Sequence, residues 1–326
     1  MHDRDLRPMH PNATAQARKV HGKPIVQTYG EIDMYRIVAR ASALAAAFFM
    51  GLAALPAMAD TLDDIIERGV LVVGVKADYA PWGMRDSDGN LVGMEHDMIA
   101  DFARRLSEHA GKPIEVEKIV VVASNRMQFL EQGQTDMFIA TMSNKPDRRK
   151  VVGIVQPDYY SSGVAVLAHK DSGIDGWASL EGKKICGIQG AWYNKDHGLK
   201  NGAEIVAFKG VTEVEKAVLD GRCVGWVYDD SAFIPRKVNE PEKWQDYAIG
   251  TPTVDDVPWG AAVRLEDREA PLGKFLSAAI IDWHKSGLLI ELEAKWGIPA
   301  TAWLAEMQQK CLADDPICND AYDEGE

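Results

Sequence analysis

Short apolar runs, mostly of β-branched residues, alternate along this chain with segments of helical period, and this alternation strongly limits its possible folds. The runs 70–75 (VLVVGV) and 136–141 (DMFIAT) have the length and composition of buried strands. Between them, residues 98–111 carry apolar side chains on one helical face and end in a glycine. Since strands that alternate with helices need crossover connections, the pattern predicts an α/β fold with mostly parallel sheets.

The second half of the chain repeats the alternation. The runs 183–190 and 203–210 are expected to be strands, and residues 211–221 are expected to form a helix. Thr212 and Glu215 have the spacing of a capping box, which predicts how this helix begins.

Two segments, 129–143 and 217–231, share one pattern of helix end, glycine, strand and polar cluster. Thr141 and Asp229 occupy the same position in this overlay, and Ser143 follows shortly after Thr141. Ligands of open α/β sheets bind beyond the carboxyl ends of the strands. The overlay therefore predicts a cleft with Thr141 and Ser143 on one wall and Asp229 on the other.

These residue types suit a free α-amino acid, which presents a carboxylate close to an ammonium group. Arg148 could bind the carboxylate through its guanidinium, assisted by the hydroxyls of Thr141 and Ser143. Asp229 could receive the ammonium group. The alternative is that Arg148 belongs to a solvated basic turn at 146–150 (PDRRK).

The N-terminal region has the features of an export signal. Basic residues precede an apolar run at 41–55, and an A-x-A cleavage pattern follows at 57–59. We therefore expect a signal peptide over 34–59. The alternative is an N-terminal membrane anchor, and residues 1–33 are expected to be a non-native or disordered extension.

Four cysteines follow this region, which in an exported chain suggests two disulfides. Three pairings are possible. The short spacing of Cys311 and Cys318 favours a local bridge and leaves Cys186 with Cys223. A zinc site is the rival interpretation, although no histidine lies near these cysteines in the sequence.

Composition and motifs exclude several other functions. The net charge of −13 argues against nucleic acid or an anionic membrane as a partner. The histidines lack metal-binding spacing, and no phosphate-binding loop or nucleophile motif is present. We expect no cofactor, no metal and no catalytic residue.

Several motifs in a fixed order resemble one family, the bacterial periplasmic amino-acid-binding proteins of ABC importers (solute-binding family three, type II fold). The motifs are GVLVVGVKADYAPWGMRDSDGNLVGMEHDM, GQTDMFIATMSNKPDRRK, QPDYYSSGVAVLAHKDSGI, LEGKKICGIQG, GRCVGWVYDD and PWGAAVR. The resemblance implies two lobes that close on a ligand, joined by crossover strands near 159–162 and 252–261. The implied segments are 60–160 with 258–300 for lobe one, 161–257 for lobe two, and 301–326 for a tail with the local disulfide.

The resemblance also implies residue roles. Arg148 matches the arginine that holds the ligand carboxylate, with Thr141 and Ser143 as its neighbours, and Asp229 matches the aspartate that receives the ammonium group. Trp82 matches an aromatic residue that packs over the ligand side chain.

One loop departs from the family pattern. Ala191 stands where a small hydroxyl residue usually helps to hold the carboxylate, and Trp192 follows it. A backbone N–H can still bind there, but a large ring enters the rim of the cleft.

Ligand identity is predicted from cationic residues. Arg126 resembles an arginine found in glutamate and aspartate binders, although general amino-acid binders share it. With Lys76 and Arg148 it would place three cations around one ligand, which favours a dicarboxylic amino acid. The alternative is that Lys76 or Arg126 pairs with a nearby carboxylate, namely Asp78, Glu95 or Asp97.

The resemblance thus implies a monomeric periplasmic protein that binds glutamate or aspartate and delivers it to a membrane permease, without catalysis. One alternative is a general polar amino-acid binder. Another is an enzyme of the cyclohexadienyl dehydratase type, for which Glu95 or Asp97 would have to serve as acid or base. A sensory ectodomain is the third.

Overall fold

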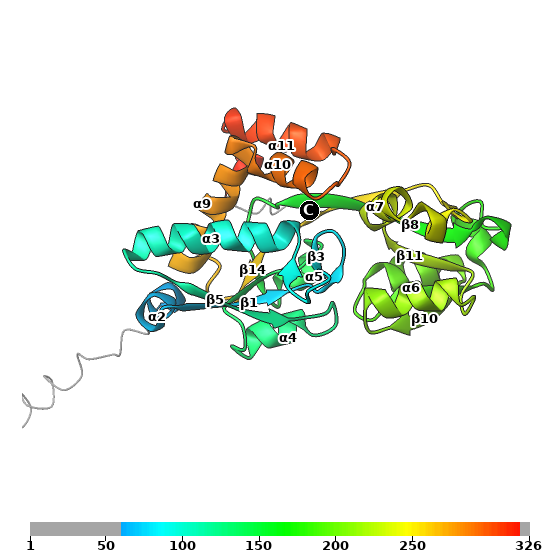
Figure 1. The fold of residues 1–326 in the computed structure, drawn as a ribbon, viewed down its shortest axis with the longest axis horizontal. Coiled ribbons are helices and arrows are strands. Elements are labelled where there is room, and N and C mark those ends of the chain that lie inside the picture. Colours follow the sequence, from blue (N-terminus) through cyan, green and yellow to red (C-terminus); the bar gives the residue numbers. More distant parts are fainter. Residues whose placement is uncertain (1–59, 320–326) are drawn as a thin grey trace, which may run out of the picture. The chain divides into compact units, whose positions relative to one another are not determined.

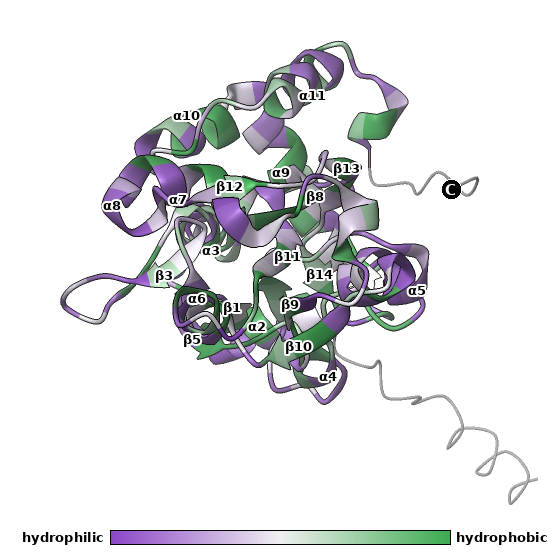
Figure 2. Cartoon of the chain, turned by 90° about the vertical axis from the view of Figure 1, so that its right-hand side faces the viewer, coloured by the Kyte–Doolittle hydropathy of each residue, from purple (hydrophilic) through white to green (hydrophobic). Residues whose placement is uncertain are grey.

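The computed structural model describes residues 60–319 (Figure 1). The predicted extension 1–33 and signal peptide 34–59 lie outside the described residues, as do residues 320–326 of the predicted tail. Within the described part, two main sheets are flanked by helices, as the alternation of apolar runs predicts. Figure 2 shows hydrophobic residues along many of the strands, whereas α5 (Pro146–Arg149) and α8 (Pro241–Trp244) are largely hydrophilic.

The first sheet has the strand order β5-β1-β6-β14-β7. β1 runs parallel to β5 and β6, whereas β14 is antiparallel to both β6 and β7. These strands are β1 (Val70–Val75), β5 (Glu115–Val120), β6 (Met137–Ile139), β7 (Gly153–Ile154) and β14 (Ala262–Val263). The sheet, its helices and the small sheet β2-β3-β4 form what we call lobe one. The added elements are α2 (Thr61–Arg68), β2 (Asp78–Tyr79), β3 (Gly83–Arg85), β4 (Leu91–Val92), α3 (Met94–Ala110), α4 (Arg126–Glu131) and α5.

The second sheet has the order β10-β9-β11-β8-β12, and β13 also pairs with β8. Its strands are β8 (Tyr160–His169), β9 (Lys184–Ile188), β10 (Glu204–Phe208), β11 (Gly225–Asp229), β12 (Tyr247–Ile249) and β13 (Val254–Trp259). With its helices it forms what we call lobe two. These helices are η1 (Lys170–Ser172), η2 (Trp177–Leu180), η3 (Asn194–Gly198), η4 (Leu199–Asn201), α6 (Val211–Leu219), η5 (Asp230–Ala232), α7 (Phe233–Asn239) and α8.

Two antiparallel strands carry the chain between the lobes. β8 leaves lobe one and β13 returns to it, and they pair with Tyr160 opposite Trp259 and Ser162 opposite Val257. Lobe one is therefore discontinuous in sequence, because β14 follows β13 and joins the first sheet. The residue limits given above for the lobes stay a prediction.

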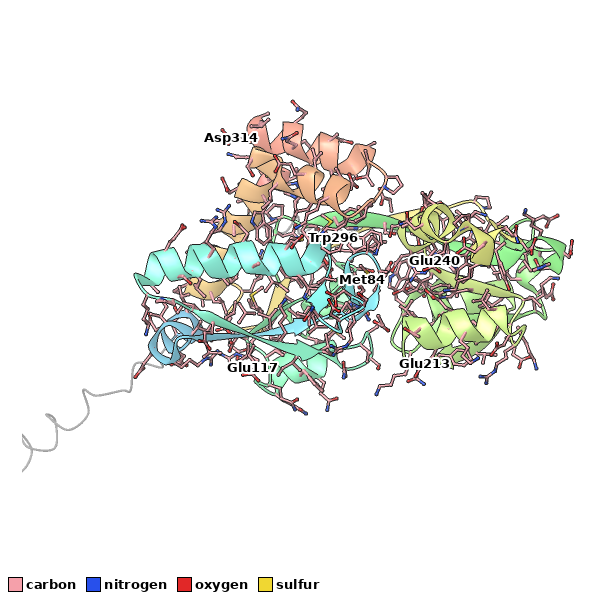
Figure 3. The ribbon with its side chains drawn as sticks, in the orientation of Figure 1. Met84, Glu117, Glu213, Glu240, Trp296 and Asp314 are labelled. Carbon is pink, nitrogen blue, oxygen red and sulfur yellow. A yellow bond between two sulfur atoms is a disulfide. The ribbon has the colours of Figure 1, made fainter. Side chains whose placement is uncertain are left out.

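The prediction that Thr212 and Glu215 form the capping box of α6 is wrong. The helix begins one residue before Thr212, with Gly210 as its N-cap, and Glu213 rather than Glu215 accepts the N–H of the N-cap residue at 2.8 Å. Glu213 is labelled in Figure 3. A glycine cap has no side chain to bind the first turn, so that partner must come from elsewhere.

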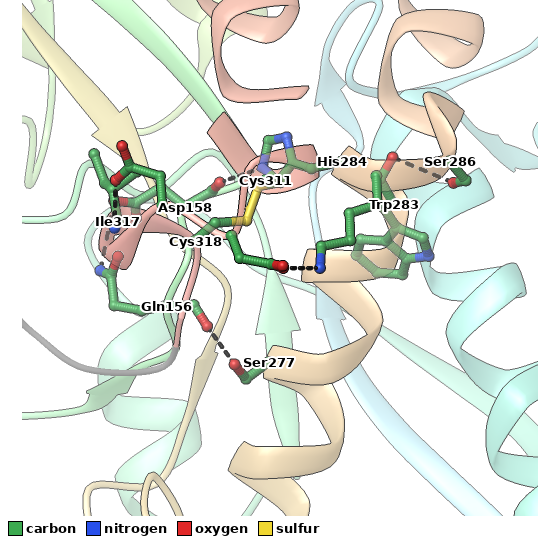
Figure 4. Close-up of a disulfide and its surroundings, with 12 residues drawn as sticks. Gln156, Asp158, Ser277, Trp283, His284, Ser286, Cys311, Ile317 and Cys318 are labelled. Carbon is green, nitrogen blue, oxygen red and sulfur yellow. Dashed lines mark hydrogen bonds and ion pairs between the residues drawn. A yellow bond between two sulfur atoms is a disulfide. The ribbon is translucent and has the colours of Figure 1, made fainter. Parts of the chain in front are cut away.

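Three α-helices follow β14: α9 (Pro271–Ser286), α10 (Leu288–Lys295) and α11 (Ala302–Leu312). α9 is bound to the segment before β8, since Ser277 donates to the Gln156 carbonyl at 2.6 Å and His284 Nε2 lies 2.8 Å from the Asp158 carbonyl (Figure 4). Both expected disulfides are confirmed, Cys186–Cys223 within lobe two and Cys311–Cys318 between α11 and η6 (Pro316–Cys318).

Candidate amino-acid-binding cleft

A cavity between β6 and β11 collects all the predicted ligand-binding residues except Trp82. It is lined by Lys76, Ala123, Arg126, Thr141, Ser143, Arg148, Ile188, Ala191, Trp192, Tyr193, Tyr228 and Asp229. Its volume is about 20 Å³, which is little more than one water molecule needs. An amino acid can therefore enter only if the walls move apart.

Two larger cavities elsewhere in the described part have weaker chemistry. One of about 510 Å³ lies beside Cys223, and one of about 380 Å³ lies beside the crossover strands. Neither is lined by a buried charged residue, whereas the smaller cavity combines buried cations with a buried carboxylate.

Arg148 is buried on α5, with its guanidinium held by backbone carbonyls. Nη1 donates to the Ser143 carbonyl at 3.0 Å and Nη2 to the Gly190 carbonyl at 3.4 Å. Loss of hydration, and next the nearby charge of Arg126, lower the pKa of Arg148 to about 10. The side chain does not lie in a solvated turn, because only 6% of the residue is exposed.

Arg126 is a second buried guanidinium in the same lining. It donates from Nη1 to the Ala140 carbonyl, and its Nε has no hydrogen-bond partner. Within residues 60–319, neither Arg126 nor Arg148 has a carboxylate at ion-pair distance. Burial lowers the pKa of Arg126, which is the direction expected for a desolvated cation without a close counter-ion.

Thr141 follows the end of β6 and has a left-handed backbone conformation, with φ of 50°. Its N–H donates to Glu95 Oε1 at 2.7 Å and to the Tyr159 hydroxyl oxygen at 3.0 Å. Because the N–H of Thr141 is already bound within the protein, only its hydroxyl group is left to donate to a ligand. Desolvation raises the pKa of Glu95 to about 7, although the hydrogen bonds from Tyr159 and Thr141 oppose that rise.

Asp229 ends β11 and supplies the carboxylate of the opposite wall. It is 5% exposed, and Tyr79 donates its hydroxyl to Oδ2 at 3.0 Å. Desolvation raises the pKa of Asp229 to about 7, while the bond from Tyr79 opposes the rise. An ammonium group that arrived here would stabilise the ionised form.

The loop after β9 reaches across the cleft. Trp192 donates from Nε1 to Ser143 Oγ at 3.1 Å, and Lys145 Nζ lies 3.8 Å from the centre of its ring. Gly190 has φ of +81°, and a Cβ there would lie 2.9 Å from the backbone of Ser124. This position therefore needs glycine for both its conformation and its close approach to lobe one.

Lys76 forms an ion pair with a nearby carboxylate, which was the alternative to its predicted role in binding the ligand. It is 3% exposed, and its Nζ pairs with Asp78 Oδ1 at 2.8 Å. Its charge is therefore already balanced within the protein.

Trp82 lies apart from the cavity lining. It is fully buried and packs against Tyr79 and Trp259, with ring centres 5.2 Å and 5.5 Å away. Tyr79 itself reaches Asp229, and Tyr193 and Tyr228 line the cavity, but sequence reasoning missed all three. Their positions beside Trp192 and Asp229 in the sequence were the only available signal for the last two.

Residues 71–299 match the family of bacterial extracellular solute-binding proteins, family 3. The chain belongs to this family. No cluster of metal-ligating side chains occurs among residues 60–319, and no helix in that range is long and apolar enough to cross a membrane.

Proteins similar to this chain are named for different ligands or activities. The chain is 24% identical over 249 residues to the glutamate/aspartate import solute-binding protein of Salmonella typhimurium, covering 74% of this chain and 80% of that protein. It is also similar to a crystal structure of the P235GK mutant of ArgBP from T. maritima, with 26% identity and a TM-score of 0.65 over 72% of this chain and 98% of that one. A second similar structure is the ancestral amino acid-binding protein AncCDT-1, a precursor of cyclohexadienyl dehydratase, with 25% identity, a TM-score of 0.63 and coverage of 73% and 99%.

Proposed function

We propose that this chain captures glutamate or aspartate between its two lobes and delivers it to the permease of an ABC importer. The observation that carries the proposal is the pair of buried guanidinium groups, Arg126 and Arg148, that face one cavity without a carboxylate partner in the described part of the chain. Arg148 takes the α-carboxylate, Arg126 takes the side-chain carboxylate, and Asp229 takes the ammonium group.

Charge balance favours an acidic ligand over the alternatives. Lys76 is neutralised by Asp78, so Arg126, Arg148 and Asp229 leave the lining with one surplus positive charge. A dicarboxylic amino acid carries one net negative charge near neutral pH and cancels that surplus. A neutral amino acid leaves it buried, and a basic one adds to it, which costs free energy in a desolvated site.

The family relationship supports the transport role, and the named glutamate/aspartate relative supports the choice of ligand. The similar structure named for arginine shows that ligand identity varies among such folds. We place the protein in the periplasm, exported by the signal peptide predicted at 34–59, and acting as a monomer that does not bind nucleic acid.

The dehydratase alternative has less support. It is considered because the similar AncCDT-1 structure is named as a precursor of cyclohexadienyl dehydratase. Glu95 and Asp97 would have to act on the ligand. Glu95 Oε1 instead binds Thr141 and Tyr159, and Asp97 Oδ2 accepts from Lys295 at 2.8 Å and Trp296 at 2.6 Å. Neither carboxylate lines the cavity.

A calorimetric panel tests the proposal. The chain from residue 60 onward would be unfolded and refolded to remove bound solutes, and then titrated with each common amino acid and with prephenate. We expect tight binding of glutamate or aspartate only. In Arg126→Gln we expect acidic ligands to bind at least tenfold more weakly, because the contact to the side-chain carboxylate is lost. Glutamine should bind no more weakly than before, because the variant removes the surplus buried charge that disfavours a neutral ligand.

The exposed Arg85→Gln variant is the matched control for removing a lobe-one arginine. Preferred binding of neutral or basic amino acids would keep the capture function but refute the role of Arg126. Consumption of prephenate, followed by its absorbance, would instead support the enzyme.

A further inference from the structure

The first turn of α6 in lobe two receives its missing cap from lobe one. Val211, the first residue of the helix, donates its N–H to Asp78 Oδ2 at 2.8 Å. Asp78 lies in β2, 133 residues earlier in the chain. A carboxylate at this place satisfies an otherwise unpaired N–H and complements the positive end of the helix dipole.

The same carboxylate also serves the binding cavity. Its other oxygen, Oδ1, pairs with Lys76 at 2.8 Å, and Lys76 is one of the lining residues. Asp78 thus contacts a cavity cation with one oxygen and the opposite lobe with the other. It does not line the cavity itself.

Gly210 makes the close approach possible. A Cβ at this position would lie 2.6 Å from Asp78 Oδ2, which is closer than a carbon and an oxygen can pack. Its φ of −138° is open to any residue, so conformation does not require glycine here. The absence of a side chain at Gly210 matters because it admits Asp78.

We propose that Asp78 is a positioning residue that clasps the two lobes in the closed state while holding the charge of Lys76 neutral. Opening the cleft separates β2 from α6, which exposes the Asp78 carboxylate and the Val211 N–H together. The clasp thereby slows the escape of the ligand without touching it. This inference rests on the proposed function only in taking the cleft as the ligand site.

A double-mutant cycle with L-glutamate as the probe tests the clasp. Gly210→Ala is expected to weaken binding about tenfold, mainly through faster dissociation in stopped-flow fluorescence, because its methyl group collides with Asp78. Asp78→Ala is expected to weaken binding about fivefold, as typical of a lost cap. In the double variant the methyl group at position 210 meets no carboxylate. The double variant should therefore bind L-glutamate with the same affinity as Asp78→Ala alone.

Gly176→Ala is the matched control, since it makes the same change in lobe two where no atom lies within 4 Å of the added methyl group. It should bind like the unaltered chain. Additive effects of the Asp78 and Gly210 changes would overturn the clasp, as would an unchanged dissociation rate in Gly210→Ala.

A second measurement separates failure of the clasp from failure of the proposed ligand. Small-angle X-ray scattering without added amino acid should show a larger radius of gyration for Gly210→Ala than for Gly176→Ala, and the double variant should match Asp78→Ala. If L-glutamate does not bind the unaltered chain, the proposed ligand is wrong, and this scattering result alone decides the clasp. Equal radii for Gly210→Ala and Gly176→Ala would refute it.

Discussion

The two walls of the cleft are built from opposite chemistry. The wall of lobe one presents Arg126 and Arg148, which are buried guanidinium groups without carboxylate partners among residues 60–319. The wall of lobe two presents Asp229, a buried carboxylate whose hydrogen-bond partner is the neutral hydroxyl of Tyr79. A ligand with both signs of charge would satisfy both walls at once, whereas neither lobe alone could hold it. The division of charge between the lobes would therefore couple binding to closure.

Removing Arg148, one of the two buried guanidinium groups of the lobe-one wall, is expected to have the largest effect. Arg148→Gln should weaken binding of every amino acid at least a hundredfold in calorimetry, because the α-carboxylate loses a charge-assisted contact in a desolvated site. Arg85→Gln should bind normally. If Arg148→Gln lost only acidic ligands, the roles given to Arg126 and Arg148 would have to be exchanged.

The carboxylate of lobe two should make binding depend on pH. Because the pKa of Asp229 is raised to about 7 by burial, it must lose a proton before it can pair with an ammonium group. We expect affinity to fall by up to about tenfold for each pH unit below 7. In Asp229→Asn, binding should be weaker at pH 8 and the dependence between pH 5.5 and 7 should flatten.

The stability of the free protein should show the opposite trend. The pKa of Asp229 in the folded chain lies above its ordinary value of 3.8, so the folded state binds more protons than the unfolded state between these limits. This group therefore lowers stability as the pH rises from about 4 to 7. A Tm series on the ligand-free chain measures this contribution as the difference from Asp229→Asn, and equal pH slopes for the two would contradict the raised pKa.

The smallest effect on affinity is expected from a change to Trp192, which bridges the two walls by its hydrogen bond to Ser143. Trp192→Phe keeps the ring beside Lys145 but removes the hydrogen bond to Ser143. A net contribution of about 1 kcal/mol for such a bond corresponds to a change of roughly fivefold or less in affinity. If Trp192→Phe instead broadened the range of amino acids bound, Trp192 would act on ligand size rather than on closure.

Local patterns in the sequence determined the alternation of strands and helices, the local Cys311–Cys318 bridge and the polar residues at the ends of β6 and β11. These features depend on residues close together in the chain, so periodicity and spacing could predict them. The start of α6 at Val211 was predicted, but its N-cap was missed, because a glycine cap offers no side-chain signal. The carboxylate that binds the first N–H of the helix belongs to Asp78, which lies far away in sequence.

Only the tertiary structure decided which charges are paired. The sequence allowed Lys76 and Arg126 equally to meet a carboxylate, but folding placed Asp78 beside Lys76 and left Arg126 without a carboxylate partner in the described range. Likewise, Tyr79 reaches Asp229 across 150 residues, and Glu95 takes the N–H of Thr141. The contacts of Tyr79 and Glu95 depend on how distant elements pack, and the choice of Lys76 over Arg126 depends on which groups lose their water together; no local pattern of residues encodes either.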